Sequence, residues 1–425
     1  MSRSPGVPGM IALLGVLALS VAACGSSGSA QAPDGRPSRA SATSGSVDGR
    51  LVVGALLPES GELAAFGPAE AAGVKAAVAD INASGGVLGR KVGLVQADSG
   101  EGISGAARTS VGRLLSEHAD LVIDGGSSAT ALSVRDEVTH AGTVQLSPSA
   151  TSPQLDSSWA DPHDTFFRTV PSDVLQARVL AHQVLADGHS HVAVLARKDS
   201  YGTCLADELE KDLESGGGAL TAKVLYPPDA DKFASEVDKI ESTRPDAIIV
   251  VGYDETERII SAMIGQHTGP QHVQVYFTDG NTVDYSEKFP SGTLTGVVGT
   301  HPGKALTDAL RRKLLGIDPG LKDFTFGPES YDATVLAALA VEAAKSDDPA
   351  RFAPEITRVS RDGEPCATFR KCSALVRAGK DIDYNGVSGS VDLDDSGSPT
   401  QGTITVVRYG ADNSYTDIAH ITGPG

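Results

Sequence analysis

From Leu51 onward, short apolar runs rich in β-branched residues alternate with longer segments in which apolar residues recur every three or four positions. The first pattern is typical of buried strands and the second of helices that bury one face. We predict strands at 51–57, 91–98, 121–123, 143–147, 166–170, 191–196, 219–226, 246–253 and 272–279. We predict helices at 68–82, up to about 118, and at 130–140, 174–186, 201–214, 233–243, 255–267, 304–315 and 330–345.

The order of these elements predicts an α/β protein with two Rossmann-like lobes. Strand and helix alternate twice with short connections, and a pause over 152–164 separates the two rounds, which favours two parallel sheets. The last part, 390–410, looks like a strand, a turn and another strand, and we interpret the tail as material returned to both lobes. We expect one lobe from 50–170 plus about 300–380, and the other from 171–299 plus about 381–425.

The first 23 residues are predicted to be a targeting segment. Arg3 precedes an apolar run over 10–21 that is too short to span a membrane in the mature protein. The run ends in Val21-Ala22-Ala23-Cys24, which resembles the lipobox of bacterial lipoproteins and implies cleavage before Cys24 and lipid on its sulfur. An ordinary signal peptide with a chance cysteine is the alternative. The Gly/Ser/Ala/Pro-rich stretch that follows Cys24, up to residue 49, is predicted to be a flexible tether.

The net charge argues against one class of partner, and the cysteines suggest one covalent cross-link. The net charge of −19 over 425 residues argues against a uniform basic surface for nucleic acid. In an exported chain, Cys366 and Cys372 are close enough in sequence to predict a local disulfide. Cys204 is left over, and we expect it to be a buried free thiol; a reactive thiol near a helix start is the alternative.

Candidate chemistry begins in the segment 120–130, DLVIDGGSSAT. A short strand leads through a glycine turn into hydroxyl residues that open a helix. Free backbone N–H groups and the positive end of the helix dipole favour an anion there, and Ser127 and Ser128 add hydroxyl donors. A small carboxylate or phosphate fits this arrangement. The alternative is a plain helix cap that binds nothing.

Ligands of open parallel sheets bind beyond the carboxyl ends of the strands. Hydroxyl residues follow the strands of the first lobe, and aromatic residues and one carboxylate follow those of the second. If the lobes face each other, this polarity suits a zwitterion, with its carboxylate on the hydroxyls and its ammonium on Asp279 near tyrosine rings. Each residue could instead serve a turn, the core or the rim. The candidates are Phe66, Ser127, Ser128, Ser149, Thr151, Tyr201, Tyr253 and Asp279.

A family resemblance rests on motifs that occur in a fixed order. These are VVGALLPESGELAAFG, ADINASGGVLGRKV, GGSSAT, QLSPSATSP, DSYGTCLA and GYDE, and they span about 50–420. Together they resemble the type I periplasmic binding proteins, and most closely the branched-chain amino acid group that serves ABC importers. The resemblance implies two α/β lobes joined by three crossovers, which close on a small-molecule ligand. It implies no cofactor, a monomer, and a membrane permease as partner.

The family's ligand residues carry over one position at a time. The hydroxyl after the glycine turn falls on Ser128, and the contacts to the ligand carboxylate fall on Ser149 and Thr151. The family tyrosines fall on Tyr201 and Tyr253. In the best-known members a glutamate stands where this chain has Asp279, and a tyrosine is frequent where it has Phe66. The amino acid frame is therefore kept, while the side-chain preference need not be for leucine.

Two other functions compete with import. The same clamp could act as a sensor that passes its ligand state to a membrane receptor. A secreted hydrolase with Ser128 as nucleophile needs a base, and only His118 and His140 offer one, outside any recognisable motif. Asp392, Asp394 and Asp395 loosely resemble a calcium loop, but Thr403 stands where its last ligand, a glutamate, belongs, so we predict a turn and no metal.

Overall fold

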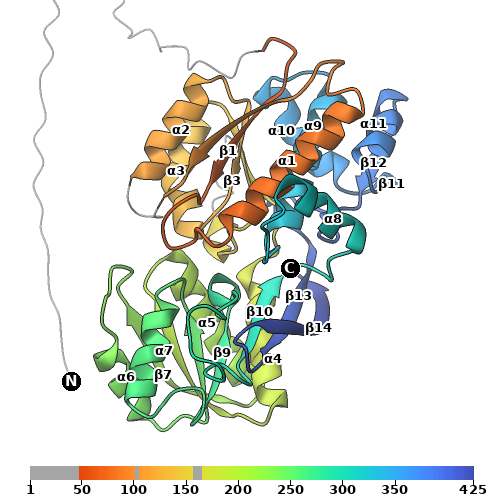
Figure 1. Ribbon diagram of the computed structural model, residues 1–425. Coiled ribbons are helices and arrows are strands. Elements are labelled where there is room, and N and C mark those ends of the chain that lie inside the picture. Colours follow the sequence, from red (N-terminus) through yellow and green to blue (C-terminus); the bar gives the residue numbers. More distant parts are fainter. Residues whose placement is uncertain (1–46, 101–104, 157–164) are drawn as a thin grey trace, which may run out of the picture. The chain divides into compact units, whose positions relative to one another are not determined.

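The computed structural model describes residues 47–100, 105–156 and 165–425. The predicted signal peptide, Cys24 and nearly all of the tether lie outside the described residues. Within them, two open sheets, each covered by helices on both faces, form two lobes (Figure 1). The α/β fold class with two lobes is confirmed.

The first lobe is built on a five-stranded, all-parallel sheet with the strand order β2-β1-β3-β4-β5. Its strands are almost continuously apolar because both faces are covered. Along β1, Val53, Ala55 and Leu57 lie in one core cluster and Leu56 in another, on the opposite face. The strands are β1 (Val52–Leu57), β2 (Gly93–Asp98), β3 (Leu121–Asp124), β4 (Val144–Ser147) and β5 (Phe166–Arg168).

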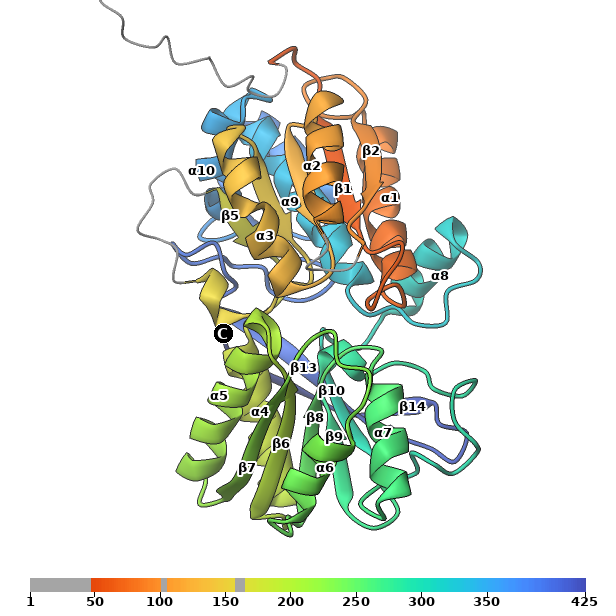
Figure 2. The same ribbon diagram turned by 90° about the vertical axis from the view of Figure 1, so that its left-hand side faces the viewer.

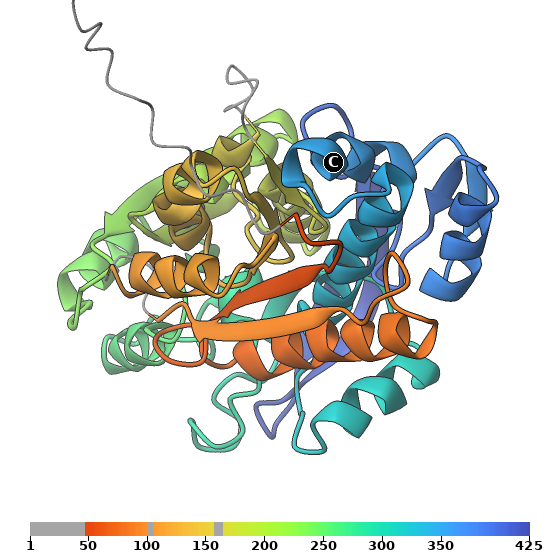
Figure 3. The ribbon, with the colours of Figure 1, turned by 90° about the horizontal axis from the view of Figure 1, so that it is seen from above.

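Helices sandwich this sheet, as Figure 3 shows for β1 and β2 between α1 and the pair α2 and α3. The helix α9 is buried on nearly all sides because it packs between α1 and α10. Its alanines allow these close approaches. The helices are α1 (Gly67–Ala83), α2 (Ala106–Ser116), α3 (Ser128–His140), α8 (Asp308–Ile317), α9 (Gly327–Ala344), α10 (Pro349–Val359) and α11 (Phe369–Arg377).

The second lobe is built on a seven-stranded mixed sheet with the order β14-β13-β10-β9-β8-β6-β7. Five strands run parallel, whereas β13 pairs antiparallel with β10 and β14 pairs antiparallel with β13. The predicted parallel sheet is present in five strands, and the tail adds an antiparallel pair at its edge. The strands are β6 (His191–Arg197), β7 (Ala219–Tyr226), β8 (Ala247–Val251), β9 (Gln274–Phe277), β10 (Val298–Pro302), β13 (Gln401–Tyr409) and β14 (Tyr415–Pro424).

Two pairs of helices cover the second sheet, one pair on each face (Figure 2). The helices α4 and α5 bury Leu175, Leu180 and Leu205 against one face. The other face is covered by α6 and α7 through Val237, Ile259 and related residues. The helices are α4 (Asp173–Ala186), α5 (Ser200–Ser215), α6 (Ala234–Glu241) and α7 (Thr256–Gly265).

Along the described residues the chain passes between the lobes three times, after β5, after β10 and before β13. The second and third passages differ from the expected boundaries. The strand β10 (Val298–Pro302) still belongs to the second sheet, whereas 382–393 packs in the first core through Ile382, Tyr384 and Leu393. The Tyr384 hydroxyl helps to hold 382–393 in the first lobe, because it donates to the buried Asp332 of α9 at 2.7 Å.

Several small elements escaped the sequence pattern. The stretch expected as the first tail strand forms only isolated bridges, and the real hairpin lies later, in β13 and β14. A two-stranded sheet of β11 (Glu364–Cys366) and β12 (Ile382–Tyr384) carries α11 beside it. Short 3₁₀ turns lie at Pro153–Leu155 and Asp279–Asn281. Such short elements have too few residues to show a period.

The cysteines of the first lobe form the predicted disulfide. Cys366 at the end of β11 is bonded to Cys372 in α11, with the Cα atoms 5.4 Å apart. Cys204 is free and half-buried in α5, not buried as expected. Burial still raises the pKa of its thiol, which disfavours the thiolate that a reactive cysteine needs.

Candidate functional site

A small cavity lies where the two lobes meet, and all eight sequence-predicted site residues line it. Its volume is about 20 Å³, enough for one water molecule. Each of the eight side chains is at most 5% exposed. A larger cavity of about 470 Å³ shares Phe66, Tyr253 and Gly280 with it and opens outward. Besides the eight, the inner cavity is lined by Leu63, Glu70, Gly126, Gly280 and Phe326.

The amino end of α3 forms part of the first-lobe wall. Ser127 is the N-cap, and its hydroxyl oxygen accepts the amide of Thr130 at 3.0 Å. Ser127 therefore caps its own helix and also lines the cavity. Ser128 is the first residue of the helix, and its oxygen accepts the amide of Ser152 at 3.0 Å. The hydroxyl proton of Ser128 and the amides of the first turn, which have no partner within the helix, can therefore serve a guest.

The loop after β4 completes this wall. Its backbone turns around the Ser147 hydroxyl, which accepts the amide of Ala150 at 3.0 Å. The Ser149 oxygen accepts the amide of Gly126 at 2.9 Å, so this loop is joined directly to the glycine turn. The fully buried Arg168 fixes the loop from behind by donating to the carbonyl of Thr151 at 3.0 Å. Arg168 had no signal in the sequence.

Asp279 stands on the second-lobe wall in a dense hydrogen-bond network. Its Oδ1 accepts from the Tyr201 hydroxyl at 2.6 Å and from Gln176 Nε2 at 2.9 Å. Gln176 also accepts the Asp279 amide at 3.0 Å and the Thr300 hydroxyl at 2.9 Å. One carboxylate is therefore held in place from both its side chain and its backbone.

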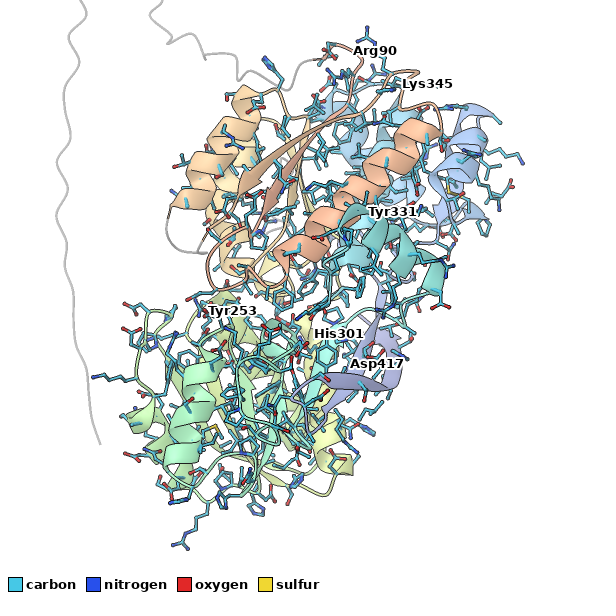
Figure 4. All side chains as sticks on the ribbon, in the orientation of Figure 1. Arg90, Tyr253, His301, Tyr331, Lys345 and Asp417 are labelled. Carbon is cyan, nitrogen blue, oxygen red and sulfur yellow. A yellow bond between two sulfur atoms is a disulfide. The ribbon has the colours of Figure 1, made fainter. Side chains whose placement is uncertain are left out.

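Aromatic rings form the remaining sides of the cavity. Tyr201 and Tyr253 stack with their centroids 5.4 Å apart, and the Arg197 guanidinium lies 4.5 Å from the Tyr253 ring centre. Tyr253, labelled in Figure 4, lies just beyond the end of β8. From the first lobe, Phe66 meets Phe326 edge to face at 5.3 Å. These rings offer an apolar surface between the two polar walls.

Burial dominates the electrostatics of the second wall. It raises the pKa of Asp279 above its usual range, while the hydrogen bonds from Tyr201 and Gln176 oppose the rise. It also raises the pKa of Asp173, which is buried beside Asp279 and repels it. Such a carboxyl pair would be stabilised by a cationic group placed against it.

Glu70 in the first turn of α1 is a second buried carboxyl group on the cavity lining. Its side chain is fully buried, and neither oxygen makes a hydrogen bond of good geometry among the described residues. Burial raises its pKa to about 8, although the Ser149 hydroxyl and the Gly126 amide lie close enough to oppose the rise. An acidic residue in the first turn of a helix is common because it interacts favourably with the helix dipole. The sequence therefore offers no reason to include Glu70 among the site residues.

One group of carboxylates outside the cavity has the spacing of a metal site. Oxygens of Glu62, Asp254 and Glu255 lie within 4.8 Å of one another. Arg197 forms ion pairs with both Glu62 and Glu255, so a guanidinium already supplies the positive charge there. These residues therefore fit an arginine-centred ion-pair cluster better than a metal centre.

A serine-hydrolase arrangement is absent from the described site. The residues lining the inner cavity include no histidine. His140 lies twelve residues after Ser128 on α3, which at 1.5 Å per residue separates them by about 18 Å along the axis. The Ser128 oxygen accepts a backbone amide and has no imidazole beside it. Asp394 accepts the amide of Ser396 within its own turn, as expected for a turn residue.

Comparison with known proteins decides the family. The model of the periplasmic binding protein family matches residues 51–413. The chain belongs to this family. Its members are binding proteins, which agrees with the lobed fold, and the family implies a location outside the cytoplasm. The described residues contain no helix that is both long and apolar enough to span a bilayer.

Individual relatives are distant but cover most of the chain. A chemotactic signal transduction system substrate-binding protein, BasB, from Halobacterium salinarum is 28% identical over 83% of this chain and 85% of its own. A Leu/Ile/Val-binding protein homologue from Brucella melitensis is 26% identical over 75% of this chain and 85% of its own. The crystal structure of the leucine-binding protein LivK from Thermotoga maritima has a TM-score of 0.71 at 21% identity. The match covers 87% of this chain and 98% of LivK and shows the shared fold.

Proposed function

We propose that this protein is the lipid-anchored solute-binding component of an ABC importer and that it captures an amino acid, branched-chain or related, between its lobes. The ligand carboxylate would bind the α3 amino end with Ser128, Ser149 and Thr151. Its ammonium would bind Asp279, and its side chain would lie among Phe66, Tyr253 and Phe326. No bond is made or broken, and the closed form is delivered to a permease.

The observation that carries this proposal is the polarity of the inner cavity. One wall offers hydroxyls and helix amides, and the opposite wall offers a buried carboxylate. A zwitterion satisfies both walls, whereas a simple anion leaves Asp279 without a counter-charge and a simple cation leaves the helix end without an anion. The names of the Leu/Ile/Val-binding and leucine-binding relatives support an amino acid as the class of ligand.

Closure of the lobes would explain how a cavity of about 20 Å³ admits such a guest. Direct bonds join the lobes beside the site. The Ser152 hydroxyl donates to the Ser200 carbonyl at 2.7 Å, and Glu62 of the first lobe pairs with Arg197 of the second. Opening would break these contacts, and a ligand that bridges both walls would restore them, which couples binding to the hinge.

A sensing role is a second candidate, favoured by one comparison. The relative BasB bears the name of a chemotactic substrate-binding protein and aligns over most of both chains. In that role the same capture step would present the closed form to a membrane receptor instead of a permease. Ligand chemistry is the same in both roles, and co-purification of the membrane partner separates them.

A thermal-shift screen tests the ligand class. The protein with Cys24→Ser would be screened against the twenty amino acids, small amides, urea and small carboxylates. A ligand at 100 times its Kd stabilises by about 2.7 kcal/mol, which raises Tm by several degrees. A shift with one class of amino acid would support the proposal. A shift only with carboxylates or amides would keep the fold and refute the zwitterion site.

Anchoring is tested separately by Cys24→Ser in the full chain. Loss of the lipid should move the protein from the membrane fraction to the soluble fraction, because the acyl chains would supply the anchor. Continued sedimentation with membranes would contradict the lipoprotein proposal and leave the ligand proposal untouched.

A further inference from the structure

Glu70 lies beside the same helix end that would bind the ligand carboxylate. A Cβ atom added at Gly125 would lie 2.1 Å from Glu70 Oε2, so the carboxyl group is packed directly against the glycine turn before α3. Ser149 and Gly126, which line the cavity, are its nearest donors. Two carboxyl groups, one from the protein and one from the guest, would therefore meet at one helix terminus.

The cavity contains no positive side chain to separate them. Among the described residues that line it, none is lysine, arginine or histidine. The fully buried Arg168 of the first lobe is turned away toward the carbonyls of Ala150, Thr151 and Ser152. An ionised Glu70 would repel a ligand carboxylate across a dry gap, where charges are poorly screened.

We propose, on the basis of the proposed function, that Glu70 is a direct ligand contact that binds as a neutral acid and donates its proton in a hydrogen bond to the ligand carboxylate. The hydrogen bond joins the Glu70 carboxyl O–H to a ligand oxygen, and no covalent bond changes. An acid hydrogen-bonded to a carboxylate is a short, charge-assisted pair. Glu70 thereby makes affinity for the α-carboxylate depend on pH.

The surroundings of Glu70 favour the neutral form. Burial is the largest influence and raises its pKa to about 8, and the charge of Asp124 on β3 acts in the same direction. Glu329 on α9 is another buried acid that repels Glu70. The charge of Lys304 acts against the rise in the pKa of Glu329. Across the cavity stand Asp279 and Asp173, also acids with raised pKa values.

The sign of the pH dependence follows from these groups. Glu70 must be protonated to donate, so its contribution is present below about pH 8 and is lost as pH rises through that value. Asp279 and Asp173 have the opposite effect, because ionisation strengthens their attraction for an ammonium group. A variant that removes only the titration of Glu70 therefore isolates the first contribution.

The test is isothermal titration of L-leucine into the wild type and Glu70→Gln at pH 7, 8 and 9. The amide of glutamine keeps the donor and the volume but does not titrate. Wild-type affinity should fall about tenfold from pH 7 to pH 9, in proportion to the protonated fraction. Glu70→Gln should keep the pH 7 affinity within about threefold and should lose this fall.

Glu329→Gln is the matched control. Glu329 is equally buried, with its pKa also raised to about 8, but it lines a neighbouring cavity and not the inner one. Because Glu329 and Glu70 repel each other, its substitution should move the midpoint of the wild-type fall toward lower pH at most and should keep the fall itself. Glu70→Leu, which keeps bulk without a donor, should weaken binding at every pH, and the unliganded Tm of each variant reports its folding.

Three results would overturn the proposal. Identical pH profiles for the wild type and Glu70→Gln would mean that Glu70 does not titrate against the ligand. Loss of leucine binding in folded Glu70→Gln would mean that an ionised Glu70 holds a cationic group. If the wild type binds none of the twenty amino acids at pH 7, the proposed function fails, and this inference fails with it.

Discussion

The two walls of the cavity differ in how far the protein has already satisfied its own polar groups. On the second-lobe wall, Asp279 is held by Tyr201 and Gln176 before any ligand arrives. On the first-lobe wall, Ser128 and Ser149 accept backbone amides, Ser128 keeps its hydroxyl proton available, and Glu70 has no hydrogen bond of good geometry among the described residues. Under the proposed function, the first wall would receive the guest and the second would present a carboxylate that is already held in place.

This difference suggests a division of labour in binding. A carboxylate that is already fixed gains an ammonium partner at little entropic cost, so the second wall should contribute most of the affinity. A wall of adaptable hydroxyls and one titrating acid can discriminate among carboxylates and respond to pH. Weakening one wall at a time tests how much each wall contributes to affinity.

Asp279→Ala should have the largest effect. Removing one member of a buried charge pair costs about 2–5 kcal/mol, which corresponds to about 30- to 5,000-fold weaker binding of an amino acid. Titration calorimetry measures the loss, and an unchanged circular dichroism spectrum shows that the fold persists. The exposed Asp284, in the loop that follows, gives the control Asp284→Ala, which should bind normally. Unchanged affinity in Asp279→Ala would refute the polarity of the site.

Ser128→Ala should have an intermediate effect, because it removes one neutral donor to a charged group. Such a hydrogen bond contributes about 1.5–3 kcal/mol, or about 10- to 150-fold in Kd. Ser133→Ala is the control on the same helix, since its hydroxyl only donates to the Thr130 carbonyl. A loss in Ser128→Ala as large as in Asp279→Ala would show that the first wall, and not the second, holds most of the affinity.

Glu62→Gln should have a small effect on Kd through closure. Its pairing with Arg197 crosses the cleft, and the glutamate side chain is 24% exposed, so we expect at most about 1 kcal/mol, or about fivefold. Glu364→Gln breaks an exposed pair within the first lobe and is the matched control. Dissociation rates by stopped flow should rise for Glu62→Gln alone. Equal rates in both variants would remove this ion pair from the closing mechanism.

The double substitution Cys366→Ser and Cys372→Ser should leave Kd unchanged. The disulfide closes a short loop away from both walls, and its loss should cost about 2 kcal/mol of stability by the chain-entropy model. Differential scanning calorimetry should therefore show a lower Tm with normal binding. A change in Kd would mean that the site depends on the edge of the first lobe.

Site residues directly after a strand could be predicted from the sequence, whereas those in helices away from a strand end could not. Ser128, Tyr201 and Asp279 could be predicted because the carboxyl ends of parallel strands meet at one edge. Glu70 and Gln176 lie in α1 and α4, where a single polar residue has no distinctive neighbours in sequence. Their importance comes from tertiary packing, which brings them to the cavity lining and to Asp279.

The same contrast holds for the fold. Long apolar strands such as β8 and long helices such as α9 have periods that a sequence shows clearly. The segment 382–393 is held in the first lobe by buried apolar residues and by several hydrogen bonds to Asp332, including one from Tyr384, and no local pattern encodes these contacts. The antiparallel hairpin of β13 and β14 could not be placed in the second sheet either, because its partner strand β10 is distant in sequence.

The most direct test of the central claim compares two ligands on two proteins. L-Leucine and 4-methylpentanoate, which is leucine without its amino group, would be titrated into the wild type and Asp279→Asn. If Asp279 holds the ammonium, the substitution should weaken leucine by at least about 30-fold and change 4-methylpentanoate by less than about threefold. Equal losses for both ligands, or no loss for leucine, would contradict the account.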